Sequence, residues 1–148
     1  MLRLYSKGCE HAIQVLSQMG SRDSSQVFSI KEICERIEVP EWSTRKTFQK
    51  LVRKGILKAS QGPSGGYQFK ARPNRISILR IIQVVDGKDA LKECVMGFSK
   101  CCNKNSCSFH AVWTEVRSTV ETALKLTFLN QLFSCNRNFE RRTKNSGV

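Results

Sequence analysis

The residues best suited to chemistry are concentrated in one short stretch, residues 94–110, "CVMGFSKCCNKNSCSFH". This stretch holds four of the seven cysteines in the chain and one of its two histidines. Three of the cysteines and the histidine follow the pattern Cys94-x6-Cys101-x5-Cys107-x2-His110. Thiolate and imidazole groups suit zinc, copper(I) and iron–sulfur centres. The pattern lacks the close Cys-x2-Cys pairs of common zinc sites, and its wide gaps favour a larger iron–sulfur cluster, with zinc as the alternative.

The sequence predicts a cytoplasmic protein with no membrane partner. No apolar run approaches the roughly 20 residues that span a bilayer. The first residues, "MLRLYSKGCEHAIQVL", carry charges within their apolar run and lack a cleavage site for a signal peptide. In a reducing cytosol, clustered cysteines are more often metal-binding or redox-active than disulfide-bonded. Cys9 and Cys34 lie in apolar helical patterns and are interpreted as small buried side chains.

The charge of the chain indicates a polyanionic partner. Lysine and arginine number 25 against 12 acidic residues, which gives a formal net charge of +13. DNA, RNA, an anionic membrane and a merely soluble basic surface all fit such an excess. The position of the basic residues along the chain has to decide between them.

The order of the first elements predicts a winged helix-turn-helix domain over residues 1–75, within a mainly α fold. Residues 7–19 form an amphipathic pattern, and Ser29 with Glu32 forms a capping box before a second helix. A third helix is expected from about residue 41 to 54, and Gly55 ends it. "QGPSGG" at 61–66 is typical of a hairpin turn between two short strands, the wing.

The third helix is expected to enter the major groove of double-stranded DNA, with the hairpin against the backbone or minor groove. Arg45 is expected to contact a guanine, whereas Lys50, Arg53 and Lys58 are expected to contact phosphates. The complete set of candidate DNA-binding residues is Ser29, Ser43, Thr44, Arg45, Lys46, Gln49, Lys50, Arg53, Lys58, Gln61 and Ser64.

The rest of the chain divides into three parts. Residues 76–110 contain a linking helix, "ISILRIIQVVDG", which Ser77 caps, and the Cys-rich loop. Residues 111–134 form a long amphipathic pattern and are predicted to be a dimerisation helix, with packing against its own domain as the alternative. Residues 135–148 form a polar basic tail that is predicted to be disordered.

Several motifs in this order resemble a known family. They are "LRLYSKG" at the start, "QGPSGGY" at 61–67, "ISILRIIQVVDG" at 76–87, the Cys-rich loop and "HAVWTEVR" at 110–117. The family is that of the winged-helix transcription factors that include the iron–sulfur cluster regulator IscR and the nitric-oxide-sensing repressor NsrR. The resemblance covers residues 2–133 and implies a homodimer that binds a pseudo-palindromic operator.

The resemblance also implies a ligand set of three cysteines and one residue of another type. Carried over, these ligands are Cys94, Cys101, Cys107 and His110, with Cys102 and Glu10 as possible alternates. A 2Fe–2S cluster is favoured over 4Fe–4S. The chain departs from the family pattern at several places, including Arg45 and Lys46, which stand where the cluster regulator has acidic or neutral residues. The first gap between cysteines is one residue longer, and Gln61 stands where family wings often carry arginine, whose charge a narrow minor groove attracts.

The sequence therefore predicts a regulator, expected to be a repressor, whose operator affinity depends on a cluster that senses redox stress, nitric oxide or iron status. One alternative is a cluster-free switch based on zinc or on the Cys101–Cys102 thiols. Another is an iron–sulfur carrier that does not bind DNA. No catalytic triad, carboxylate pair or phosphate-binding loop is present in the sequence, so an enzyme is not expected.

Overall fold

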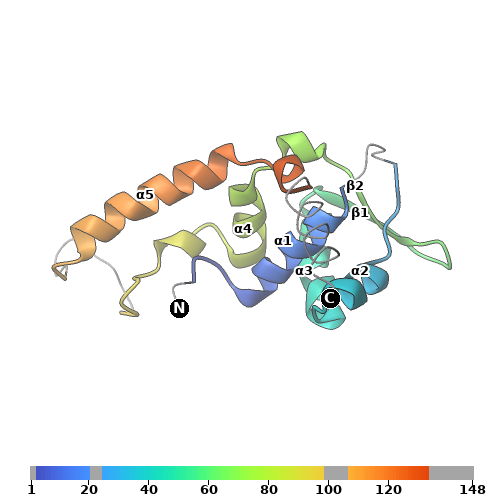
Figure 1. The fold of residues 1–148 in the computed structure, drawn as a ribbon, viewed down its shortest axis with the longest axis horizontal. Helices are drawn as coiled ribbons and strands as arrows, with labels where there is room; N and C mark the ends of the chain where they lie inside the picture. The colour runs from blue at the N-terminus through green and yellow to red at the C-terminus, as the bar shows by residue number, and fades with distance from the viewer. Residues whose placement is uncertain (1–2, 21–24, 99–106, 134–148) are drawn as a thin grey trace, which may run out of the picture.

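The computed structural model describes residues 3–20, 25–98 and 107–133 and shows a mainly helical chain with one hairpin (Figure 1). This confirms the predicted fold class. The elements in chain order are α1 (Lys7–Gln18), α2 (Ile30–Ile37), α3 (Glu41–Arg53), β1 (Leu57–Ser60), β2 (Gly66–Phe69), the short 3₁₀ helix η1 (Pro73–Arg75), α4 (Ile78–Asp86), the 3₁₀ helix η2 (Ala90–Lys92) and α5 (His110–Leu126).

Serine side chains start three of the helices. Ser6, Ser29 and Ser77 each accept a hydrogen bond from the backbone N–H three residues later, which satisfies one of the free donors of the first turn. The predicted caps at Ser29 and Ser77 are confirmed. Gly55, which follows the C-cap residue Lys54 of α3, has a φ of 74°, so it adopts the left-handed conformation that the sequence predicted there.

The wing is an antiparallel hairpin in which Leu57 pairs with Phe69 and Ser60 with Gly66. A third segment joins it, because the Phe28 N–H donates to the Tyr67 carbonyl (2.7 Å) and the Tyr67 N–H donates to the Phe28 carbonyl (3.0 Å). A β-carbon at Gly66 would collide with the Phe28 carbonyl oxygen, so this close approach requires glycine. The wing is thereby fixed to the segment that leads into α2.

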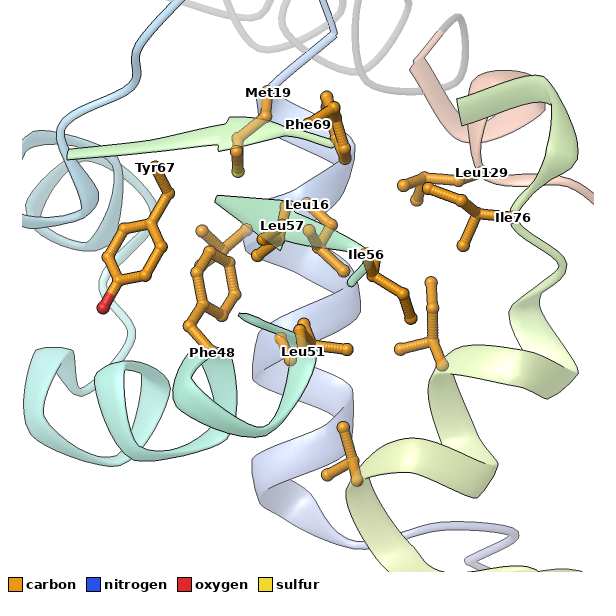
Figure 2. Packing of buried hydrophobic residues seen from close by; sticks show 14 of the residues in the cluster. Leu16, Met19, Phe48, Leu51, Ile56, Leu57, Tyr67, Phe69, Ile76 and Leu129 are labelled. Carbon is orange, nitrogen blue, oxygen red and sulfur yellow. The ribbon is translucent and has the colours of Figure 1, made fainter. Parts of the chain in front are cut away.

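One apolar core holds α3 against α1 and the hairpin (Figure 2). Phe48 of α3 is fully buried, and its ring meets the ring of Tyr67 edge-on, with centroids 5.2 Å apart. Leu16 of α1 and Leu51 of α3 are also fully buried in this cluster. The position of α3 relative to the wing is therefore set by core packing.

The predicted helix over 111–134 is wrong in its extent. α5 ends at Leu126, and residues 129–133 form a separate helical turn. Between them the chain is extended: the Ile78 N–H donates to the Thr127 carbonyl, and the Leu129 N–H donates to the Ile76 carbonyl, both at 2.9 Å. This interruption brings Leu129 into the core, where it is fully buried. An apolar pattern alone does not show such a break, because both helical pieces continue the same stripe.

α5 runs alongside α4 and extends away from the hairpin (Figure 1). Within the part of the chain that the structure describes, Trp113 is the only residue of α5 whose side chain is buried. No helix within residues 3–20, 25–98 and 107–133 is long and apolar enough to span a membrane. Cys101, Cys102 and the predicted tail at 135–148 lie outside the described residues.

Candidate DNA interface and cysteine site

The exposed face of α3 is defined by the residues that its other face buries. Thr44, Thr47, Phe48 and Leu51 point into the domain. The residues opposite them follow helical spacing and are all exposed: Trp42, Lys46, Gln49 and Arg53. These four side chains form the outer face of α3. Two of them are basic, and one is a large aromatic residue.

Thr44, one of the predicted DNA contacts, is buried within the domain and offers no exposed side chain to DNA. Its exposed fraction is 0%, and its hydroxyl donates to the Pro40 carbonyl at 2.8 Å. Thr44 packs on the buried side of the first turn of α3, so it anchors the helix. Ser43 is half-buried, and its hydroxyl also donates to the Pro40 carbonyl, at 3.3 Å.

Arg45 is held at the edge of the outer face by other residues of the domain. Its Nε donates to the Glu41 carboxylate at 2.6 Å. This bond is the main reason that the pKa of Arg45 is raised, and the Tyr67 side chain contributes in the same direction. Arg45 therefore lies between α3 and the wing, and contact with a guanine requires it to leave or share its Glu41 partner.

Glu41→Gln tests whether Glu41 positions Arg45. We expect the variant to bind unrelated duplexes more tightly, because the released guanidinium can contact phosphates. The ratio of operator affinity to non-specific affinity should then fall by about tenfold, the size of one guanine contact. Fluorescence anisotropy with operator and scrambled duplexes measures both affinities.

Glu35→Gln is the matched control, since it removes one exposed carboxylate from α2. If both variants change both affinities by the same factor, Glu41 acts only through its charge and does not position Arg45.

Two of the other predicted DNA contacts, Lys50 and Ser29, make hydrogen bonds within the domain. Lys50 is turned toward α4, and its Nζ donates to the Val85 carbonyl at 2.8 Å. Ser29 is half-buried and caps α2. The remaining residues are exposed on α3 or on the wing, where they stay candidates for DNA contact: Lys46, Gln49, Arg53, Lys58, Gln61 and Ser64.

Trp42 was not among the residues predicted to contact DNA. It is 77% exposed, and the Lys46 ammonium lies 5.6 Å from the centroid of its ring. The signal was available, since Trp42 lies opposite the buried stripe of Thr44, Phe48 and Leu51 on a helical wheel. An aromatic residue is easily assigned to the core by its type alone.

Two hydrogen bonds join α5 to the backbone just before the first cysteine of the Cys-rich segment. The Trp113 indole N–H donates to the Glu93 carbonyl at 3.2 Å, and the Arg117 guanidinium donates to the Lys92 carbonyl at 3.3 Å. Trp113 itself is 6% exposed. These bonds place Cys94, the next residue, beside the first turns of α5. Cys94 and Trp113 line the same small cavity of about 130 Å³.

Cys107 and His110 lie at that same end of α5. His110 is the first residue of the helix, and its backbone N–H donates to the Cys107 carbonyl at 3.0 Å. Because His110 is one turn before Trp113, it shares the helix face that meets Glu93. Cys94 is half-buried and Cys107 is exposed. The fold thus brings two predicted thiolate ligands and the predicted imidazole ligand to one end of one helix.

The donor types at this end of α5 fit an iron–sulfur cluster or zinc. Among the described residues, no group of three or more His, Cys, Asp or Glu side chains is arranged to hold a metal ion. Cys101 and its alternate Cys102 lie outside those residues. Glu10, the other alternate ligand, is bound to Lys7 at 2.8 Å, which lowers the pKa of its carboxyl.

Cys9 and Cys34 are buried, as predicted, with exposed fractions of 0% and 2%. Burial, followed by the nearby Asp86 carboxylate, raises the pKa of Cys9 to about 12. Such a thiol stays protonated near neutral pH and is a poor nucleophile and metal ligand. The buried cysteines are therefore part of the core and not of the cysteine site.

Comparison with known proteins shows the family to which the chain belongs. Residues 5–134 match the Rrf2 family model, described as an iron-dependent transcriptional regulator. A Haemophilus influenzae protein whose name places it among HTH-type transcriptional regulators is 30% identical over 142 residues, 96% of this chain and 93% of that protein. The HTH-type transcriptional regulator IscR of Vibrio vulnificus is 27% identical over 135 residues, 91% of this chain and 79% of that protein.

Solved structures show the same fold. The structure of CymR, the global cysteine regulator of B. subtilis, matches with a TM-score of 0.72 at 21% identity and covers 90% of this chain and 98% of that chain. From the outward basic face of α3, the wing beside it and the match over nearly its whole length, the chain belongs to the Rrf2 family of DNA-binding transcriptional regulators.

Proposed function

We propose that this protein is a homodimeric repressor whose affinity for its operator is controlled by an iron–sulfur cluster in the 94–110 segment. The observation that carries the proposal is the placement of Cys94, Cys107 and His110 together at the start of α5. These donors lie between α4, which contacts the DNA-reading helix, and α5, the proposed dimer helix. The resemblance to IscR and NsrR regulators supports the same assignment.

The dimer is proposed from the second face of α5. One face packs on the domain through Trp113 and the half-buried Leu124. The adjacent face carries exposed apolar and small side chains at helical spacing: Val112, Val116, Thr119, Ala123 and Leu126. An apolar stripe of this length along one helix is suited to pairing with a second copy, because pairing removes both stripes from water.

The dimer fits the proposed operator geometry. Two copies joined along α5 would present two α3 helices, and half-sites about 34 Å apart would receive them. A pseudo-palindromic operator is therefore proposed, as the two-fold symmetry of such a dimer requires.

A physical route joins the cysteine site to the DNA-reading helix. It runs through the last turn of α4, whose Val85 carbonyl accepts the hydrogen bond from Lys50 of α3. In the same turn, the Asp86 carboxylate accepts bonds from the Ser6 backbone N–H (2.7 Å) and the Ser6 hydroxyl (2.5 Å), just before α1. Eight residues later the chain reaches Cys94. A shift of the 93–94 segment along α5 can therefore move α3 through α4.

In this proposal Cys94, Cys101, Cys107 and His110 would hold the cluster, with Cys102 and Glu10 as alternates. The bound cluster would supply an iron centre that reacts with oxidants and nitric oxide. A 2Fe–2S cluster is favoured over 4Fe–4S, since a mixed cysteine and histidine set is known for two-iron centres. The described residues contribute two of the thiolates, from Cys94 and Cys107, the His110 imidazole, and the Trp113 and Arg117 bonds that fix the backbone around Cys94.

A cluster-free switch that uses thiols or zinc is the second candidate. Cys107 is exposed, and exposed thiols in a basic protein are open to oxidation and to zinc. The adjacent Cys101 and Cys102 are the proposed reactive pair. In this candidate the DNA-binding half of the protein is unchanged.

The test of the proposed function has two parts. Protein purified without oxygen is assayed for iron, sulfide, zinc and visible absorption, and the same sample is used to select operator fragments from genomic DNA. Near-equal iron and sulfide with a selected palindromic site would support the cluster regulator. Colourless protein that holds zinc or no metal after reconstitution would contradict it and favour the second candidate.

Lys50→Met tests the route through α4. The change keeps most of the side-chain stem but removes the bond to the Val85 carbonyl. The measured quantity is the ratio of operator affinities of the cluster-loaded and cluster-free protein. We expect the logarithm of this ratio to fall below half its wild-type value. Anisotropy titrations of both forms measure this ratio.

Lys54→Met is the control, because it removes the same charge from the end of the same helix. The contrary result is that both variants keep the wild-type ratio of cluster-loaded to cluster-free affinity and bind all DNA more weakly. That result would show that Lys50 contacts phosphates and does not link α3 to α4.

A further inference from the structure

Trp42 is a large apolar side chain placed where the protein meets DNA. Among the described residues it has the highest exposure of any large hydrophobic residue, at 77%. It lies in the first turn of α3, on the face that also carries Lys46, Gln49 and Arg53. Residues at the N-terminal end of a recognition helix are those that contact base edges. We propose that Trp42 is a specificity-determining residue that reads the methyl group of a thymine in each half-site. This inference rests on the DNA-binding function.

The chemistry of the major groove points to thymine. Base pairs present hydrogen-bond donors and acceptors on the floor of this groove, and the thymine C5-methyl is the one apolar group among them. An indole ring placed there removes the most apolar area from water against that methyl. The edges of guanine, cytosine and adenine carry no methyl group and offer the carbon atoms of the ring no comparable apolar partner.

Lys46 holds the ring in a suitable position. Its ammonium lies 5.6 Å from the ring centroid, within the range of a cation–π contact. One ring face is therefore occupied by a charge, whereas the rest of the ring remains open to solvent. In that position the ammonium can meet a phosphate while the indole faces the base pairs, so the two side chains would act as a pair.

Among the residues that the structure describes, the neighbours of Trp42 do not provide another use for it. The buried residues of α3 next in register, Thr44 and Phe48, lie on the opposite side of the helix. The exposed stripe proposed for dimerisation is on α5, a different element. Exposed tryptophan costs solvation free energy, so its position on the outer face of α3 fits a residue that is covered when DNA is bound.

The test replaces the thymines of the selected operator one at a time by deoxyuridine, which lacks only the C5-methyl. We expect wild-type affinity to fall about fourfold at one symmetry-related thymine, the value for one buried methyl. Trp42→Ala should lower operator affinity on the order of tenfold and should show no further loss when that thymine is replaced. Gln49→Ala, a change on the same face, should weaken binding but keep the fourfold penalty.

Folding of the variant is checked on the same samples. Trp42→Ala should bind scrambled duplex DNA with near wild-type affinity and keep its thermal midpoint, since Trp42 has no part in the core. Trp113 is buried and Trp42 is exposed, so acrylamide quenches mainly the fluorescence of Trp42 in the wild type, and this quenching should decrease when operator is added.

Two results would overturn the inference. One is a Trp42→Ala protein that binds operator as tightly as the wild type. The other is a variant that retains the deoxyuridine penalty at every thymine. Failure to select any DNA site would contradict the DNA-binding function itself, so the two failures are distinguishable.

Discussion

Val112→Glu combined with Val116→Glu is expected to convert the protein to a monomer and to lower operator affinity on the order of a hundredfold or more. Both valines are exposed, at 51% and 43%, and lie one turn apart on the stripe proposed for dimerisation. Four carboxylates would face one another in the dimer without partners. A monomer loses the second half-site contact, which linked binding makes worth a factor of 10²–10⁴.

Sedimentation velocity gives the oligomeric state, and anisotropy gives the affinity for full operators and for half-sites. Ser118→Glu is the matched control, because Ser118 is exposed on a different face of α5. We expect it to remain dimeric. A double valine variant that remains a dimer would show that this stripe is not the interface.

Cys107→Ser is expected to remove the cluster and to give the protein the operator affinity of the cluster-free wild type. Serine has nearly the same size, but its hydroxyl is a poor ligand for iron at neutral pH compared with a thiolate. Cys107 is exposed in this structure, so the change is expected to leave the free energy of unfolding nearly unchanged. Iron, sulfide and the visible spectrum are measured before the titration.

Cys34→Ala provides the control for cysteine chemistry in general. Cys34 is buried in the core, so this variant should lose some stability but keep its iron and its cluster-dependent affinity. If Cys107→Ser holds as much iron and sulfide as the wild type, the proposed ligand set is wrong.

The winged helix-turn-helix could be predicted from the sequence because its signals are local. Capping serines, the Gly-rich hairpin turn and apolar residues at helical spacing each specify one element. The same signals did not show the burial of Thr44. A polar side chain can be buried there because its hydroxyl donates a hydrogen bond to the Pro40 carbonyl. They also did not show the break after Leu126, which depends on bonds to Ile76 and Ile78, about 50 residues earlier.

The ligands of the candidate site could be predicted from the sequence, but the hydrogen bonds that hold them in place could not. Cys94, Cys107 and His110 could be chosen by type and spacing. The bonds that place them together, from Trp113 to the Glu93 carbonyl and from Arg117 to the Lys92 carbonyl, join side chains to backbone atoms and leave no pattern in the sequence. The same is true of the Val85 carbonyl, which accepts the hydrogen bond from Lys50.

The most direct test of the central claim is the affinity of one preparation for its selected operator, before and after removal of the cluster by a chelator under anaerobic conditions. We expect the affinity of the wild type to change at least tenfold, to recover when iron and sulfide are returned, and to show no such change in Cys107→Ser. Equal affinities for the loaded and cluster-free wild type would contradict the claim that the 94–110 segment controls DNA binding.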